Sequence, residues 1–299
     1  MGQSIAEKII AKAAGKKTVQ TGEIVTCAVD LAMIHDSGGP RRVKPAMEKL
    51  GVGVWDPAKI VLVSDHFAPC TDAESAAILK LTREWAAEQG ILNFYDQQGI
   101  CHVVTPERGH LAPGMFAVGG DSHSPTGGAF GCYMFGIGAT DMLGVLVTGE
   151  TWIKVPETIR INWSGQLGTG LAAKDMALKM CATLGMDGGG YQAIQYAGET
   201  IRNLDMLERM TLCNMAAELG AQAGIIEPDE VTAAYVEAAG GTPGDWRDFQ
   251  SDQDATYAVT HEFDATNLEP QVAAPHSPAN AADVSAIEKA EIDQFYIGA

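Results

Sequence analysis

The feature that most constrains the fold is the alternation of short apolar runs with helical patterns along the chain. Residues 60–63 form a strand-like run, and Thr71 and Glu74 have capping-box spacing at the start of the helical pattern that follows. Ser4 and Glu7 have the same spacing before an earlier apolar helical face. Because strands that alternate with helices pack as a largely parallel sheet with helices on its faces, the sequence predicts an α/β fold.

The chain is long enough for more than one domain, since its 299 residues exceed what a single core usually encloses. After Val155-Pro156 the pattern restarts, with a strand expected over 158–163 and a helix over 172–184. Prolines between 269 and 283 favour an extended connection over a helix. The predicted units are two α/β domains, 1–155 and 156–276, and a segment 277–299 that holds a linker and the first strand of a truncated third domain.

Charge and cysteine usage disfavour several classes of protein. The formal net charge of -18 repels phosphate backbones and acidic membrane surfaces, and no apolar run is long enough to span a bilayer. The six cysteines have neither the paired spacing of a zinc site nor that of a disulfide framework. We therefore expect a cytoplasmic protein that binds no nucleic acid and no membrane.

Polar residues follow two of the predicted strands. Asp65 and His66 come after the run 60–63, and Asp121, Ser122 and His123 come after a strand expected at 115–119. Parallel sheets keep their ligand sites at the carboxyl ends of strands, so the two groups are expected to line one cleft. The alternatives are solvated loop histidines and a hydrolytic triad, but adjacent residues face one another poorly, which disfavours the triad.

Three further residues have the chemistry of a site but lie in apolar surroundings. His102 falls in an apolar stretch, where a hydrogen-bonded core histidine is the alternative. Asn214 and Glu218 are four residues apart in an expected helix, 209–220, and would share one face; an ordinary helix-face glutamate is the alternative. Gly136 and Gly138 lack the third glycine of a dinucleotide fingerprint, so we attribute them to helix–sheet packing.

Taken together, these segments resemble the aconitase superfamily, in particular the large subunits of two-subunit isopropylmalate and maleate dehydratases. The resemblance implies three-layer α/β/α domains with mainly parallel sheets. The blocks that show it, in chain order, are residues 4–9, 65–66, 99–102, 119–123, 135–138, 209–215 and 275–278.

The resemblance also implies site roles. His66, held by Asp65, would protonate the departing hydroxide as a general acid, while a serine of the small subunit would remove the carbon-bound proton. The implied catalytic pairs are Asp65 with His66, His102 (the family's strand histidine) with Asp121, and His123 with Glu218. The substrate-side residues are His35, Asp36 and Ser122, and Asn214 would contact the cofactor.

That cofactor is a [4Fe-4S] cluster held by three cysteines, the first of which follows an Ile-Gly-small turn in the family. This chain ends at Ile297-Gly298-Ala299. Cys101, Cys132 and Cys213 do not stand at the family's ligand positions. We therefore expect a chain truncated before the cluster cysteines, with no metal ligands and no activity of its own.

The substrate is expected to be a small cis-unsaturated dicarboxylate. Ser37-Gly38-Gly39 looks more like maleate hydratases than isopropylmalate isomerases, so the first prediction is hydration of maleate to D-malate; the alternatives are 3-isopropylmalate and methylmaleate-type substrates. Two other classes stay open, an RNA-binding regulator, which the acidic charge opposes, and a zinc hydratase. The expected partner is a small swivel-domain subunit, with a homodimer for the isolated chain.

Overall fold

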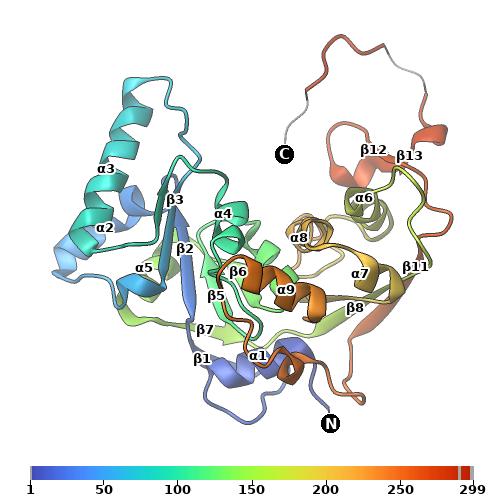
Figure 1. The fold of residues 1–299 in the computed structure, drawn as a ribbon, viewed down its shortest axis with the longest axis horizontal. Coiled ribbons are helices and arrows are strands. Elements are labelled where there is room, and N and C mark those ends of the chain that lie inside the picture. The colour runs from blue at the N-terminus through green and yellow to red at the C-terminus, as the bar shows by residue number, and fades with distance from the viewer. Residues whose placement is uncertain (1, 289–290, 297–299) are drawn as a thin grey trace.

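The computed structural model describes residues 2–288 and 291–296 and confirms the predicted α/β fold with parallel sheets (Figure 1). The first helix, α1 (Ile5–Ala13), begins at the predicted capping box, in which Ser4 caps the helix and the Glu7 carboxylate accepts the Ser4 backbone N–H at 2.8 Å. The predicted final strand lies partly outside the described residues, at 289–290 and 297–299.

The first sheet is a parallel five-stranded one, covered by helices on both faces. Its strands, in spatial order, are β4 (Phe94–Asp96), β3 (Ile60–Ser64), β2 (Leu31–His35), β5 (Phe116–Gly119) and β6 (Tyr133–Gly136). The helices are α2 (Pro40–Leu50), α3 (Ala73–Gln89) and α5 (Ala139–Thr148) on one face, with α4 (Cys101–Glu107) and the 3-10 helix η2 (Ser124–Phe130) on the other.

Alternation along the buried strands decides which helices each side chain meets. Ile34 and Leu62 pack in one core with residues of α2, α3 and α5, whereas Met33 and Val63 pack with residues of α4 and η2. Strands that are buried on both faces have continuous runs of apolar residues. This is why residues 60–63 are recognisable as a strand in the sequence.

A second parallel sheet shares the core on the Met33 side. Its strands, in order, are β10 (Ala223–Ile226), β9 (Ala193–Ala197), β8 (Thr158–Ser164) and β11 (Val259–Asp264). Its helices are α6 (Ala173–Leu184), α7 (Glu199–Asn203), α8 (Met206–Asn214) and α9 (Glu230–Ala238). The strand and helix predicted just after residue 155 correspond to β8 and α6.

Smaller elements complete the described chain. An antiparallel ribbon pairs β1 (Ile24–Ala28) with β7 (Glu150–Lys154), and the proposed domain boundary at 155 falls between β7 and β8. A hairpin pairs β12 (Gln271–Ala273) with β13 (Ala281–Asp283), where an extended connection was expected. Short 3-10 helices lie at η1 (Pro57–Lys59), η3 (Trp246–Phe249), η4 (Pro278–Asn280) and η5 (Val284–Ala286).

Two predicted helix boundaries are wrong. Asp72, not Thr71, caps α3, because its carboxylate accepts the Ser75 backbone N–H at 2.7 Å. The expected helix over 209–220 ends at Asn214, so Asn214 and Glu218 do not share a helical face. Among the described residues, the helices lack the combination of length and hydropathy that a membrane crossing requires.

Candidate functional site

The candidate site lies at the carboxyl ends of three neighbouring strands of the first sheet. Asp36 directly follows β2, Asp65 directly follows β3, and Asp121 follows β5 after one glycine. Since β2 pairs with both β3 and β5 in parallel, all three loops emerge at one edge. The polar residues that follow these strands are therefore brought together at adjacent strand ends.

Asp65 and His66 form the first pair. His66 Nδ1 donates to Asp65 Oδ1 at 2.7 Å, and the other carboxylate oxygen of Asp65 accepts the Cys101 backbone N–H at 2.7 Å. The Asp65 side chain is only 7% exposed, whereas that of His66 is 36% exposed. Asp65 is thus fixed by the protein, and part of the His66 ring is open to solvent.

Asp121 is the hub of the site. His102 Nε2 donates to Asp121 Oδ1 at 2.8 Å, and the His123 backbone N–H donates to the same oxygen at 2.8 Å. His66 Nε2 lies 3.7 Å from Asp121 Oδ2, an ion-pair distance and too long for a hydrogen bond. Hydrogen bonding to His102, then to His123 and the approach of His66 hold the pKa of the Asp121 carboxyl far below its usual range.

His102 lies on a helix, which corrects the expectation of a strand histidine. It belongs to the first turn of α4, whose N-terminal Cys101 N–H is tied to Asp65. The start of the helix is thus fixed by Asp65, and its first turn brings His102 to Asp121.

His123 and Glu218 form the third pair, across the two sheets. His123 Nε2 donates to Glu218 Oε1 at 3.2 Å, although Glu218 belongs to the turn after α8. The Asp121 carboxylate is the largest cause of the raised pKa of His123; burial opposes it, and Glu218 adds a smaller effect in the same direction as Asp121. Exposed Ser122 lies beside it, with Oγ 3.2 Å from His123 Nδ1.

The pKa of His66 is strongly raised. The Asp121 carboxylate, followed by the hydrogen bond from His66 to Asp65, raises the pKa of His66 to about 10, against an opposing effect of burial. At neutral pH its ring is an imidazolium, so His66 is able to give a proton rather than take one.

The remaining predicted substrate-side residues are closed to the cleft. Asp36 has no exposed surface, and its two carboxylate oxygens accept the backbone N–H groups of His66 and Phe67, each at 3.1 Å. His35 is 4% exposed with both ring nitrogens hydrogen-bonded to the backbone. The structure shows no open polar atom on either side chain that would favour a substrate contact.

Two residues near the site were not predicted to belong to it. Thr126 of η2 accepts a hydrogen bond from Asn214 Nδ2 at 3.0 Å, which fixes the amide at the end of α8. Gly136 packs against the turn at Asp121 and Ser122, called the hub turn below. A Cβ at Gly136 would lie 2.5 Å from the Asp121 carbonyl oxygen. A Cβ at Gly138 would have no atom within 4 Å, so attributing this pair of glycines to helix–sheet packing is wrong. The sequence showed the two glycines but not that Gly136 lies against Asp121.

The cysteines of the described residues do not fit an iron–sulfur cluster. Cys70 is exposed and the other five are buried; burial raises the pKa of Cys27 and of Cys132 to about 12, which disfavours the thiolate that iron binds. Within the described residues, one group of three or more metal-ligand side chains converges, and it contains no cysteine: His35, Asp36, Asp65 and His66. Every member of that group is already engaged in the hydrogen bonds given above.

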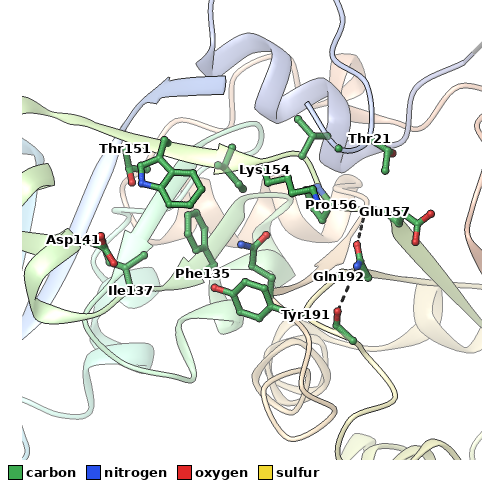
Figure 2. Close-up of a pocket in the computed structure, with 16 residues that line it drawn as sticks. Thr21, Phe135, Ile137, Asp141, Thr151, Lys154, Pro156, Glu157, Tyr191 and Gln192 are labelled. Carbon is green, nitrogen blue, oxygen red and sulfur yellow. Dashed lines mark hydrogen bonds between the residues drawn. The ribbon is translucent and has the colours of Figure 1, made fainter. Parts of the chain in front are cut away.

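The cavities lie beside the histidines rather than among them. One of about 600 Å³ is lined by residues that include Phe135, Ile137, Lys154 and Tyr191 (Figure 2). A second, of about 420 Å³, shares Ile137 and Tyr191 with it and reaches Asp121 and Ser122. A ligand in the second cavity would contact the turn at Asp121 and Ser122.

Known proteins resemble this chain along nearly its whole length. The family model described as Aconitase family (aconitate hydratase) matches residues 7–296. A 3-isopropylmalate dehydratase large subunit 1 of Methanopyrus kandleri is 46% identical over 300 residues, which cover 100% of this chain and 71% of that protein. A probable methanogen homoaconitase large subunit of Methanothermobacter thermautotrophicus is 44% identical (99% and 70%), and a 3-isopropylmalate dehydratase large subunit of Aquifex aeolicus is 43% identical (100% and 69%).

Proposed function

This chain belongs to the aconitase family, and we propose that it is the large subunit of a two-subunit dehydratase that acts on 3-isopropylmalate or a close alkyl-substituted malate. The relatives named above are large subunits of hydro-lyases, and two of them are named for 3-isopropylmalate. They favour this substrate over the maleate expected from the Ser37-Gly38-Gly39 loop.

The observation that supports the reaction best is the environment of His66. Its ring is partly exposed, while the carboxylates of Asp65, at 2.7 Å, and Asp121, at 3.7 Å, favour its charged form. In the dehydration direction, the C–O bond of the hydroxy acid breaks and His66 protonates the leaving oxygen, which departs as water. Asp65 then orients the neutral ring for reprotonation.

The other pairs hold the cleft in shape for this step. Asp121 fixes His102 and His123, and Glu218 fixes His123 from the second sheet. Ser122 presents the exposed hydroxyl of the turn, which is suited to hydrogen-bond a substrate carboxylate. The proton on the neighbouring carbon leaves to a base of the proposed small subunit.

Family large subunits bind a [4Fe-4S] cluster, and we propose one for the complete enzyme. The described residues supply no thiolate set for it, so no step of the mechanism above depends on the cluster.

The experiment is a substrate comparison with the assembled enzyme, in which a segment that carries the cluster cysteines extends this chain and the small subunit is bound, after anaerobic reconstitution with iron and sulfide. We expect kcat/KM for 3-isopropylmalate to exceed that for D-malate by roughly 100-fold, since each buried apolar group of a substrate contributes about 10-fold or more to selectivity. A preference for malate would favour the maleate hydratase instead. No turnover of either, or of methylmalate, would contradict the proposed reaction.

A homoaconitase is the second candidate, because one relative that is 44% identical has that name. Adding a homoaconitate-type tricarboxylate to the same comparison distinguishes the two.

A further inference from the structure

His35 lies between the two strand ends that bear the acid–base groups, and its ring is hydrogen-bonded at both edges. His35 Nε2 lies 3.0 Å from the Gly120 carbonyl oxygen, and the Gly38 backbone N–H lies 3.3 Å from Nδ1. A carbonyl only accepts and an N–H only donates, so these partners require the neutral tautomer with its hydrogen on Nε2. A second proton on Nδ1 would displace the Gly38 N–H.

The face of the same ring lies against His66. The two ring centroids are 3.9 Å apart and the ring planes are inclined by 9°. Burial and the charge of His66 lower the pKa of His35, against the Gly120 carbonyl and the carboxylates of Asp65 and Asp121. Asp36, the residue after His35, faces His66 as well, with 3.9 Å between Oδ1 and Nδ1. A neutral ring is thus stacked on a charged one.

We propose that His35 is a positioning residue, whose neutral ring supports the His66 imidazolium by stacking and anchors the Gly120 carbonyl, thereby fixing the His66 ring relative to Asp121. The expected effect of His35 on kcat rests on the proposed function of His66. Its expected effect on the His66 ring and pKa does not.

The physical reason is that a neutral aromatic face favours a cation in contact with it, whereas a second cation would repel it. The anchor matters because Gly120 is the residue directly before Asp121, so its carbonyl sets where the hub turn begins. The loop after His35 fits this role: a Cβ at Gly38 would lie 3.2 Å from the His35 ring and 3.2 Å from the Gly120 oxygen. Glycine lets the loop close over the ring edge.

The first test is histidine NMR on the 299-residue chain labelled at its imidazole carbons and nitrogens, with His66→Gln used to assign His66. We expect His35 to titrate below the ordinary value of 6.5 and to carry its hydrogen on Nε2 in the neutral form. In His35→Ala, water enters the vacated space and screens the carboxylates, so the pKa of His66 should fall by about one unit or more. A His35 that titrates near 6.5, or an unchanged His66 in His35→Ala, would overturn the proposal.

Two matched variants separate positioning from general stability. His35→Phe keeps a ring face but loses both hydrogen bonds, and should leave the pKa of His66 closer to wild type than His35→Ala does. His110→Ala removes another partly buried histidine, whose Nε2 is hydrogen-bonded to Tyr95, and should leave His66 unchanged. If His110→Ala shifts His66 as much as His35→Ala does, the effect is one of stability and the proposal fails.

Kinetics of the assembled enzyme distinguish positioning from substrate binding. His35→Ala should lower kcat by about 10-fold or more with KM within about twofold, because an interaction that orients the acid acts on the chemical step. A raised KM with unchanged kcat would show that His35 binds substrate. If no substrate is turned over but the NMR results hold, the proposed function fails while the positioning role of His35 stands.

Discussion

His123 and Glu218 meet at 3.2 Å although 95 residues separate them in the chain. His123 follows β5 of the first sheet, and Glu218 follows α8, which covers the second. The contact therefore joins the two halves of the described chain at the site itself. Any change in how the sheets pack would reach the acid–base groups through this pair.

Neutralising Asp121 should lower the pKa of two histidines, whereas neutralising Glu218 should lower the pKa of only one. Asp121 is the largest cause of the raised pKa of both His66 and His123, whereas Glu218 contributes to His123. Asp121→Asn should therefore lower both pKa values, and Glu218→Gln only that of His123. Histidine NMR titration measures this, and equal shifts of His66 in the two variants would contradict the assignment of Asp121 as hub.

Replacing the proposed acid should remove most of the turnover. His66→Gln keeps a polar side chain but cannot deliver a proton, so kcat of the assembled enzyme should fall by roughly 10²–10⁴-fold with a smaller change in KM. His261→Gln, on β11 in the other sheet, is the control. Near-wild-type turnover in His66→Gln would rule out the general-acid role.

Stability should depend on pH through His66. Its pKa is about 10 in the folded chain, above the ordinary value of 6.5. A raised pKa gives stability that is complete below pH 6.5 and is lost as pH rises through 10. Hence the urea midpoint of wild type should exceed that of His66→Gln at pH 6, and the difference should shrink by pH 10. A constant difference would mean that His66 stabilises by packing alone.

A methyl group behind the hub turn should disturb the site. The added Cβ of Gly136→Ala would lie 2.5 Å from the Asp121 carbonyl oxygen, and backbone atoms cannot move aside cheaply. We expect a loss of about 1–3 kcal/mol in unfolding free energy and altered titration of His66. Gly138→Ala, with nothing within 4 Å, is the matched control and should change neither. Similar effects of both variants would argue against the close approach.

The fully buried Arg209 should depend on Asp229. The carboxylate of Asp229 accepts two hydrogen bonds from the Arg209 guanidinium, at 2.8 and 2.7 Å, and also caps α9. Asp229→Asn preserves the cap but leaves the buried cation unpaired, which should cost about 3 kcal/mol in chemical denaturation. Glu230→Gln breaks an exposed pair with Arg247 at 3.9 Å and should cost less than about 1 kcal/mol.

Local sequence patterns were enough for the architecture. The run at 60–63, the capping box at Ser4 and Glu7, and the new strand after Val155-Pro156 each depend on neighbours in the chain, and each is present as predicted. Helix ends were less predictable, because Asp72 and Thr71 both have suitable oxygen atoms and only the backbone geometry decides between them.

Resemblance to a family supplied the three pairs in the site, and all three contacts are present; their catalytic roles stay predictions. Asp65 and His66 are neighbours in sequence, so their pairing was visible locally. The partners of His102 and His123 were not, because these contacts form only when strands, a helix and a turn pack together.

The sequence by itself determined the α/β class and placed acid–base residues after strands, since period and turn chemistry are local properties. Only the tertiary structure decided what His35 and Gly136 do. The His35 ring stacks on His66 and is hydrogen-bonded to the Gly120 carbonyl, and Gly136 packs against Asp121. Burial, stacking and close approach depend on which distant segments meet, and no spacing along the chain encodes those contacts.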